Sequence, residues 1–143
     1  SMIGNPISDF ELPNENGKLL QTKNYKGKIL FIDFWASWCE PCRKQIPEIK
    51  NIYNQFKNYN FKILAVSLDS EKDKQKWLKA IVKEKSTWDN VIETEEFDGK
   101  VAKMYNIHSL PSNILVNEKG IIIEQNISPE QLKKHLIKHF ELK

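Results

Sequence analysis

The two cysteines of this chain, Cys39 and Cys42, are separated by two residues and are the side chains best suited to do chemistry. Two thiols on one turn can close a small disulfide ring, which opens again by exchange with another thiol or disulfide. Pro41, between them, lacks an N–H and has a fixed φ, so it suits the first turn of a helix. We therefore expect Cys39 at a helix N-terminus, where unpaired N–H groups and the helix dipole favour a thiolate.

This placement predicts different roles for the two thiols. Cys39 should have a pKa below that of a free thiol and should attack a disulfide, whereas Cys42 should be more buried, less acidic, and should resolve the mixed disulfide. The alternatives are a structural disulfide, a zinc half-site or two buried thiols. A disulfide that closes so short a loop restricts little chain entropy. A zinc site would need ligands from His108, His135 and His139.

The histidines give little support to a metal site. His135 and His139 are four residues apart, lie among lysines and have no third ligand nearby in the sequence. We interpret them as part of a solvated helix face, and we expect no metal.

The elements that must position the cysteines are a strand and the helix that follows it. The run 29–35 is almost entirely apolar, which is typical of a central strand covered on both faces. Apolar residues then recur at helical spacing over 39–57, and Pro47 should kink this helix. A second buried strand is predicted over 61–68, and Asp69-Ser70 should cap the next helix.

The rest of the chain continues the alternation of strands and helices. The predicted elements are a hairpin within 10–22 turned at Asn16-Gly17, a helix with an apolar edge at Trp77, Leu78, Ile81 and Val82, a strand over 88–92, a helix over 98–105, a hairpin over 114–124 and a helix capped by Ser128. This order predicts an α/β fold, in which a central mixed sheet is flanked by helices and carries an N-terminal β-hairpin extension.

The composition is that of one globular domain. The chain has 143 residues, 40% of them apolar, and a formal charge of +3 from scattered lysines and the single arginine Arg43. This balance predicts a solvated surface and no nucleic-acid partner. No apolar run approaches the roughly 20 residues of a membrane span, so we expect no membrane contact by this segment. Ser1 precedes Met2, so a signal, a lipid anchor or a domain could have been removed upstream.

Residues 33–42, Asp-Phe-Trp-Ala-Ser-Trp-Cys-Glu-Pro-Cys, resemble the active-site signature of the thioredoxins. The Glu-Pro dipeptide is similar to that of the TlpA/ResA-like branch of extracytoplasmic thioredoxins, which is related to the AhpC/TSA and Redoxin proteins. Residues 9–28 and 105–120 resemble that branch's N-terminal extension and second half. The resemblance implies a single thioredoxin-like domain over residues 1–143. It also implies a thiol-disulfide oxidoreductase that reduces disulfides of extracytoplasmic proteins.

The resemblance also gives Asp33 a role in proton transfer. In thioredoxins the aspartate at this place accepts the proton of the resolving cysteine, here Cys42. A carboxylate within an apolar strand is costly to bury, and desolvation should raise its pKa into the range where it can accept that proton. The alternative is an acid at a strand end that reaches water. Some TlpA/ResA-like proteins carry a further acid three residues past the second cysteine, but this chain has Gln45 there, which cannot titrate.

A second group of residues is expected to contact the substrate. In the resembled fold, the peptide bond between Leu110 and Pro111 is cis and packs against the disulfide, and the backbone of Leu110 pairs with an extended substrate. An ordinary trans turn proline is the alternative. Trp38, Glu40 and Pro41 lie next to or between the cysteines, and Trp38 offers an apolar rim, whereas Trp35 belongs to the core.

These features predict a protein-disulfide reductase whose redox-active Cys39–Cys42 disulfide replaces any cofactor. Its partners should be protein thiol or disulfide substrates and an upstream electron donor, and we expect a monomer in the periplasm or envelope of a bacterium, with the cytoplasm as the alternative. One rival function is peroxiredoxin-like peroxide reduction, although the chain lacks that relative's lone cysteine in a Thr-x-x-Cys setting. The other is a non-catalytic module with a structural or metal-binding Cys-x-x-Cys.

Overall fold

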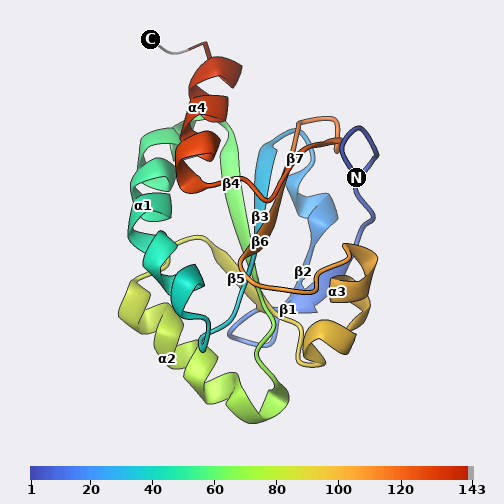
Figure 1. Cartoon of the computed structure of the whole chain (residues 1–143), viewed down its shortest axis with the longest axis vertical. Coiled ribbons are helices and arrows are strands. Elements are labelled where there is room, and N and C mark those ends of the chain that lie inside the picture. The colour runs from blue at the N-terminus through green and yellow to red at the C-terminus, as the bar shows by residue number, and fades with distance from the viewer. Residues whose placement is uncertain (142–143) are drawn as a thin grey trace.

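The computed structural model describes residues 1–141, and its centre is a five-stranded mixed sheet (Figure 1). The strand order is β5-β4-β3-β6-β7. The strands are β3 (Ile29–Trp35), β4 (Phe61–Ser67), β5 (Asp89–Ile92), β6 (Ser112–Val116) and β7 (Ile122–Gln125). β3, β4 and β5 run parallel, whereas β6 and β7 pair antiparallel. The predicted mixed sheet and its hairpin after residue 112 are confirmed.

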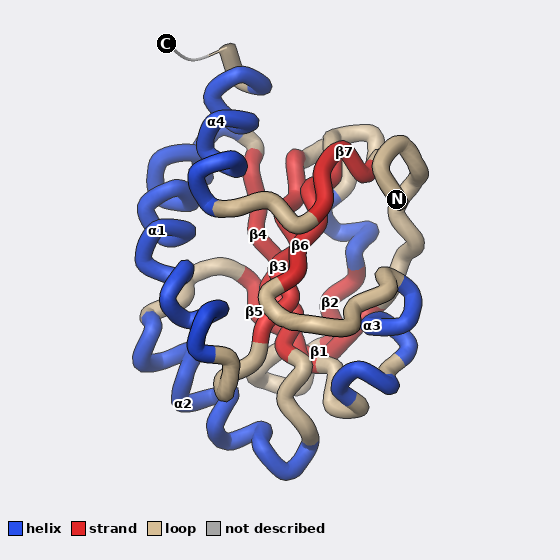
Figure 2. The backbone as a smooth tube through the Cα atoms, in the orientation of Figure 1, coloured by secondary structure: helices blue, strands red, loops and turns tan. Residues whose placement is uncertain are grey.

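Helices cover both faces of the sheet, as the alternating sequence predicted (Figure 2). α1 (Glu40–Phe56), α2 (Lys74–Glu84) and α4 (Pro129–His139) lie on one face, and α3 (Lys100–Met104) lies on the other. Four short 3₁₀ helices connect these elements: η1 (Thr22–Tyr25), η2 (Lys57–Tyr59), η3 (Glu71–Asp73) and η4 (Glu96–Asp98). The two faces enclose separate apolar clusters, one beneath α1, α2 and α4 and one beneath α3 and the N-terminal segment.

Every residue of β3 is buried, because the strand lies at the centre of the sheet between these two clusters. Its side chains alternate between the faces, as a period of two requires. Phe31 and Trp35 pack in the cluster with α1, and Ile32 and Phe34 pack in the opposite one. Asp33 is two residues from both Phe31 and Trp35 along the strand, so its side chain lies on the same face of the sheet, which α1 covers.

The predicted N-terminal hairpin forms a small sheet of its own. β1 (Glu11–Pro13) and β2 (Leu19–Gln21) pair antiparallel, and Gly17 in the turn has a φ of +78° that suits glycine. A single bridge joins Asn14 to Val91 of β5, so the hairpin lies against an edge of the main sheet. This position covers the edge strand β5, as expected for an extension that blunts a sheet edge.

The helix ends largely follow the sequence signals. Ser128 caps α4 and forms the reciprocal capping box with Gln131, as predicted. α1 continues through Pro47, which lies inside the helix. Val82 is an error in the predicted apolar edge of α2, because its side chain is 75% exposed while Trp77 and Ile81 are buried. Apolar spacing alone did not show where the edge of the buried stripe falls.

Candidate active site

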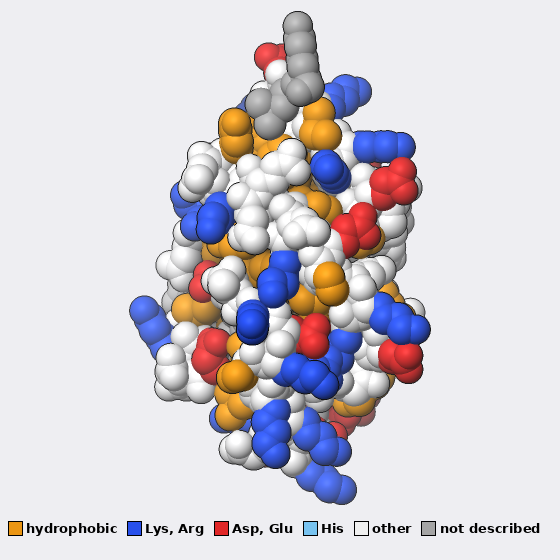
Figure 3. Space-filling view, turned by 90° about the vertical axis from the view of Figure 1, so that its left-hand side faces the viewer, with side chains coloured by type: hydrophobic (Ala, Val, Ile, Leu, Met, Phe, Trp, Pro, Cys, Tyr) orange, Lys and Arg blue, Asp and Glu red, His pale blue; other side chains and the backbone are white. Residues whose placement is uncertain are grey.

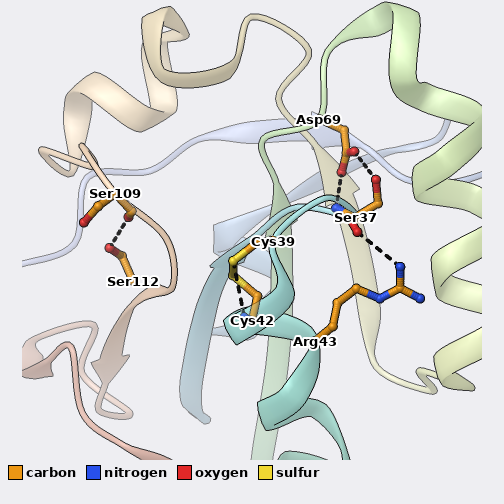
Figure 4. The surroundings of a disulfide bond; sticks show 7 residues. All are labelled: Ser37, Cys39, Cys42, Arg43, Asp69, Ser109 and Ser112. Atoms are coloured by element: carbon orange, nitrogen blue, oxygen red, sulfur yellow. Dashed lines mark hydrogen bonds between the residues drawn. A yellow bond between two sulfur atoms is a disulfide. The ribbon is translucent and has the colours of Figure 1, made fainter.

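Cys39 is the N-cap residue of α1, at the point where the chain leaves the carboxyl end of β3. Its Sγ atom accepts a hydrogen bond from the backbone N–H of Cys42 at 3.3 Å (Figure 4). Cys39 and Cys42 are joined by a disulfide, and their Cα atoms are 5.3 Å apart. A free backbone donor at a helix N-terminus stabilises negative charge on the capping atom. In the reduced protein the same geometry favours the thiolate of Cys39.

The expectation that Cys42 is more buried than Cys39 is wrong for this oxidised state. Both cysteines are 4% exposed. Both residues belong to the apolar cluster between β3 and α1, which covers them equally. The difference between the two residues therefore lies in their helix positions, since only Cys39 is the capping residue.

Asp33 is buried in the middle of β3, with 7% of its surface exposed. Burial removes water from the carboxylate and raises the pKa of Asp33 from 3.8 to about 7. Ala65 of β4 and Asn113 of β6 are its neighbours across the sheet, so no cationic side chain lies beside it in the ladder. A carboxyl group with a pKa near neutrality can exchange a proton with a thiol at physiological pH.

The Leu110–Pro111 peptide bond is cis, the isomer that the resemblance implied. This segment lies across from the disulfide, as Figure 4 shows for Ser109 and Ser112 at its two ends. The hydroxyl of Ser112 donates to the carbonyl of Ser109 at 2.7 Å and thereby closes the turn. Leu110 is half-buried and packs against both apolar clusters. The turn is thus closed by its own hydrogen bond, and Leu110 packs it against the apolar cluster that contains the cysteines.

The residues beside the cysteines form an exposed rim. Trp38 is 51% exposed, and Glu40 and Pro41 are also exposed, whereas Trp35 is buried as expected. The carboxylate of Glu40 lies 3.1 Å from the Nζ atom of Lys44, one turn further along α1. An exposed pair of this kind contributes little stability. The rim therefore leaves an aromatic ring and an acidic side chain available to a partner.

A network around Ser37 was not predicted from the sequence. Of the predicted cap Asp69-Ser70, Ser70 does cap η3, and its hydroxyl accepts from the N–H of Asp73. Asp69 has a different role. Asp69 is fully buried and accepts hydrogen bonds from the N–H of Ser37 at 2.9 Å and from its hydroxyl at 2.5 Å. The hydroxyl of Ser67 donates to the same carboxylate at 2.5 Å.

Arg43 completes this network from the first turn of α1. Its guanidinium donates to the carbonyl of Ser37 at 3.1 Å (Figure 4). It also pairs with Glu84 of α2 at 3.2 Å. Both polar groups of the Ser37 backbone and its hydroxyl are therefore held in place, two residues before Cys39. Asp69 follows the carboxyl end of β4, and Cys39 follows the carboxyl end of the parallel neighbour β3. This shared position at the strand ends was the sequence signal that could have predicted that Asp69 lies near the cysteine motif.

The prediction that His135 and His139 belong to a solvated helix face is only partly right, because both rings are partly buried and lie close to glutamates. The Nε2 atom of His139 lies 3.0 Å from Glu118, that of His135 lies 4.0 Å from Glu124, and both rings are about two-thirds or more covered. Glu118 has a lowered pKa because the hydrogen bond from His139 outweighs its partial burial. Among residues 1–141, no three His, Cys, Asp or Glu side chains are grouped so as to hold a metal ion.

A thioredoxin fold that carries Cys-Glu-Pro-Cys at the start of a helix, across from a cis-proline, defines the class of thiol-disulfide oxidoreductases. Comparison with known proteins agrees with this class. The AhpC/TSA family profile matches residues 3–125. The chain belongs to this family and, within the thioredoxin superfamily, to its TlpA/ResA-like members.

Named relatives and solved structures support the same assignment. The chain is 32% identical to the thiol-disulfide oxidoreductase ResA of Bacillus thuringiensis subsp. konkukian over 134 residues, which cover 94% of this chain and 74% of that protein. A thiol-disulfide oxidoreductase from Bacteroides fragilis is 35% identical, with a TM-score of 0.86 over 94% of this chain and 98% of that one. The thioredoxin domain of a thiol-disulfide oxidoreductase from Bacteroides vulgatus is 29% identical, with a TM-score of 0.87 over 96% and 97%.

Proposed function

We propose that this thiol-disulfide oxidoreductase is a reductant of disulfides in extracytoplasmic proteins, with Cys39 as the nucleophile and Cys42 as the resolving thiol. The observation that carries the proposal is the hydrogen bond from the N–H of Cys42 to the Sγ atom of Cys39 at the N-cap of α1. It supports a lowered pKa for Cys39 in the reduced form, because a thiolate accepts that hydrogen bond more strongly than a thiol does.

The reaction is a two-step exchange. The Cys39 thiolate attacks one sulfur of the substrate disulfide, a Cys39–substrate disulfide forms, and the first substrate sulfur leaves as a thiolate. Asp33, with a pKa of about 7, takes the proton of Cys42. The Cys42 thiolate attacks the sulfur of Cys39, the second substrate thiolate leaves, and the Cys39–Cys42 disulfide forms. Two electrons pass from the cysteine pair to the substrate, and an upstream dithiol donor restores the pair.

The remaining expected residues are proposed to hold the substrate. The backbone of Leu110 pairs with an extended peptide, while Pro111, Pro41 and the exposed ring of Trp38 offer it apolar contacts. Glu40 is exposed at the rim and contacts polar groups of the substrate. We propose that the disulfide serves in place of a cofactor and that the domain acts as a monomer.

The cell compartment is a separate proposal. The resemblance to extracytoplasmic thioredoxins favours the periplasm or the bacterial envelope, with residues 1–143 as one thioredoxin-like domain of a longer, membrane-anchored protein. None of the helices in residues 1–141 is both long enough and apolar enough to cross a bilayer. Labelling of Cys39 in intact cells by a membrane-impermeant maleimide, after reduction, would support the envelope location. Labelling only after lysis would place the domain in the cytoplasm.

Reduction of a disulfide peptide by the reduced protein, followed by fluorescence and by thiol counting, tests the activity. One substrate disulfide should be lost for each Cys39–Cys42 disulfide formed, and Cys39→Ser should abolish the reaction. Hydrogen peroxide supplied in place of the peptide tests the peroxide-reductase alternative. Rapid peroxide consumption with slow peptide reduction would overturn the proposal. Full folding stability with no exchange in either assay would point to a non-catalytic module.

A further inference from the structure

A trough lies on the surface between the start of α1 and the exposed side of α2, and Trp38, the residue before Cys39, lines it. It consists of two hollows of about 360 Å³ and 390 Å³ that share Ser37, Trp38, Arg43 and Lys83. The exposed ring of Trp38, next to the nucleophile, is common to both. We call the two hollows together the "Trp38 trough"; besides the four shared residues, its charged lining consists of Glu40, Lys44, Lys76, Lys79 and Glu84.

Hydrogen bonds and an ion pair hold the residues around Trp38 in place without any partner. Ser37 is held by Asp69 and Arg43 on both sides of its backbone, so the residue that precedes Trp38 has a set position. The Arg43–Glu84 pair, 3.2 Å apart and largely shielded from water, joins α1 to α2. A preformed surface loses less conformational entropy on binding than a mobile one.

The charge of the Trp38 trough is positive. The two hollows are lined by five cationic side chains and only two carboxylates, Glu40 and Glu84. Lys44 lies 3.1 Å from Glu40, Arg43 pairs with Glu84, and Lys76 pairs with Asp73 at 3.5 Å. Within residues 1–141, Lys79 and Lys83 take part in no ion pair, and both are exposed. Figure 3 shows Lys and Arg side chains gathered on the part of this face where α2 lies.

This concentration is local, because the whole chain carries 22 basic and 19 acidic residues and a formal charge of only +3. Lys76, Lys79 and Lys83 recur at helical spacing, so α2 presents them along one side. Charged groups of one sign beside a reactive centre raise the rate of encounter with partners of the opposite sign. An exposed aromatic ring at the same place supplies an anchor for an apolar or backbone contact.

We propose that the Trp38 trough binds an acidic polypeptide segment next to the reactive disulfide of the substrate protein, so that Asp- or Glu-flanked disulfides are the preferred substrates. This inference rests on the proposed reductase activity and names the substrate class for it. The acidic segment lies against Lys79 and Lys83 of α2 while its cysteine meets Cys39. Substrate preference is therefore set on α2, outside the cysteine motif.

The test uses three synthetic peptides with the same internal disulfide, flanked by Glu, by Gln or by Lys residues. Stopped-flow fluorescence gives the second-order rate constant for their reduction by the reduced protein at ionic strengths of about 0.01 M and about 1 M. Each rate is divided by that for the neutral disulfide of mercaptoethanol with the same variant. The parent is compared with Lys79→Glu/Lys83→Glu and with the matched control Lys133→Glu/Lys138→Glu on α4, where both lysines are likewise exposed.

At low ionic strength the parent should reduce the Glu-flanked peptide about tenfold faster than the Lys-flanked one, and salt should remove most of this difference. The Lys79→Glu/Lys83→Glu variant should lose or invert the preference, and the α4 control should retain it. Equal rates for the three peptides, or equal loss in both double variants, would overturn the inference while leaving the reductase activity intact. Failure of the parent to reduce any of the disulfides would instead refute the proposed function.

Discussion

Replacing Asp33 by Asn should increase stability at neutral and alkaline pH while slowing catalysis. Burial raises the pKa of Asp33 from 3.8 to about 7, and a displacement of that size corresponds to about 4 kcal/mol of destabilisation by the ionised form. The folded state binds the proton more tightly than the unfolded chain does. The free energy of unfolding of the parent should therefore fall between about pH 4 and pH 7 and then level off.

An asparagine cannot ionise, so the variant avoids this loss, although burial of its amide costs about 1–3 kcal/mol. Asp33→Asn should match or fall below the parent at pH 4, and the stability of the variant minus that of the parent should increase by about 3–4 kcal/mol between pH 4 and pH 8. Urea denaturation of the oxidised proteins across this range measures the difference. Glu15→Gln, at an exposed position in the hairpin turn, is the matched control, and because it retains Asp33 its stability should follow that of the parent across this range.

The same variant should resolve mixed disulfides more slowly near neutral pH, because Cys42 then has to lose its proton to water or buffer. The deficit should shrink as the pH approaches the pKa of the Cys42 thiol. Stopped-flow measurement of the resolution step across pH gives this profile. A constant stability difference between pH 4 and pH 8, together with an unchanged neutral-pH rate, would refute both the shifted pKa and the proton-transfer role of Asp33.

Further predictions concern the cysteines, the Ser37 network and a tight glycine. In single Cys→Ser variants, thiolate absorbance against pH should show that Cys39 has a pKa well below that of Cys42, since only Cys39 is the N-cap residue. Asp69→Ala should lower the free energy of unfolding by about 3 kcal/mol and slow the attack of Cys39 on a neutral disulfide, whereas Asp69→Asn should recover most of both losses by keeping an acceptor for the Ser37 N–H. Gly99→Ala should cost about 1–3 kcal/mol in urea denaturation, because its Cβ atom would lie 2.3 Å from the side chain of Glu93.

The sequence predicted the framework of the fold because each element carries a local signal. The apolar run 29–35 defines the central strand, Asn16-Gly17 defines the hairpin turn, and Ser128 with Gln131 defines the start of α4. Pro41, where the apolar strand gives way to helical spacing, likewise predicted that Cys39 lies at a helix N-terminus, and Cys39 is the N-cap residue of α1. These signals reside within a few consecutive residues, so they can be read without knowledge of tertiary contacts.

Features that depend on contacts between distant segments were not predicted. Asp69 looked like a helix cap, because only the parallel pairing of β3 and β4 brings it against Ser37, 32 residues earlier. The equal burial of Cys39 and Cys42 follows from their packing between β3 and α1. The Trp38 trough combines residues from α1, α2 and the loop before α1, whereas in the sequence its lysines were interpreted as part of a generally solvated surface.

The division of roles between the cysteines is tested most directly by trapping of a mixed disulfide. Reduced Cys42→Ser and Cys39→Ser variants are mixed with an oxidised substrate peptide, quenched with acid and resolved by mass spectrometry. Cys42→Ser should accumulate a stable disulfide between Cys39 and the peptide, because attack occurs and resolution cannot. Cys39→Ser should capture almost none. Equal trapping by both variants, or preferential trapping by Cys39→Ser, would contradict the assignment of Cys39 as the nucleophile at the N-cap of α1.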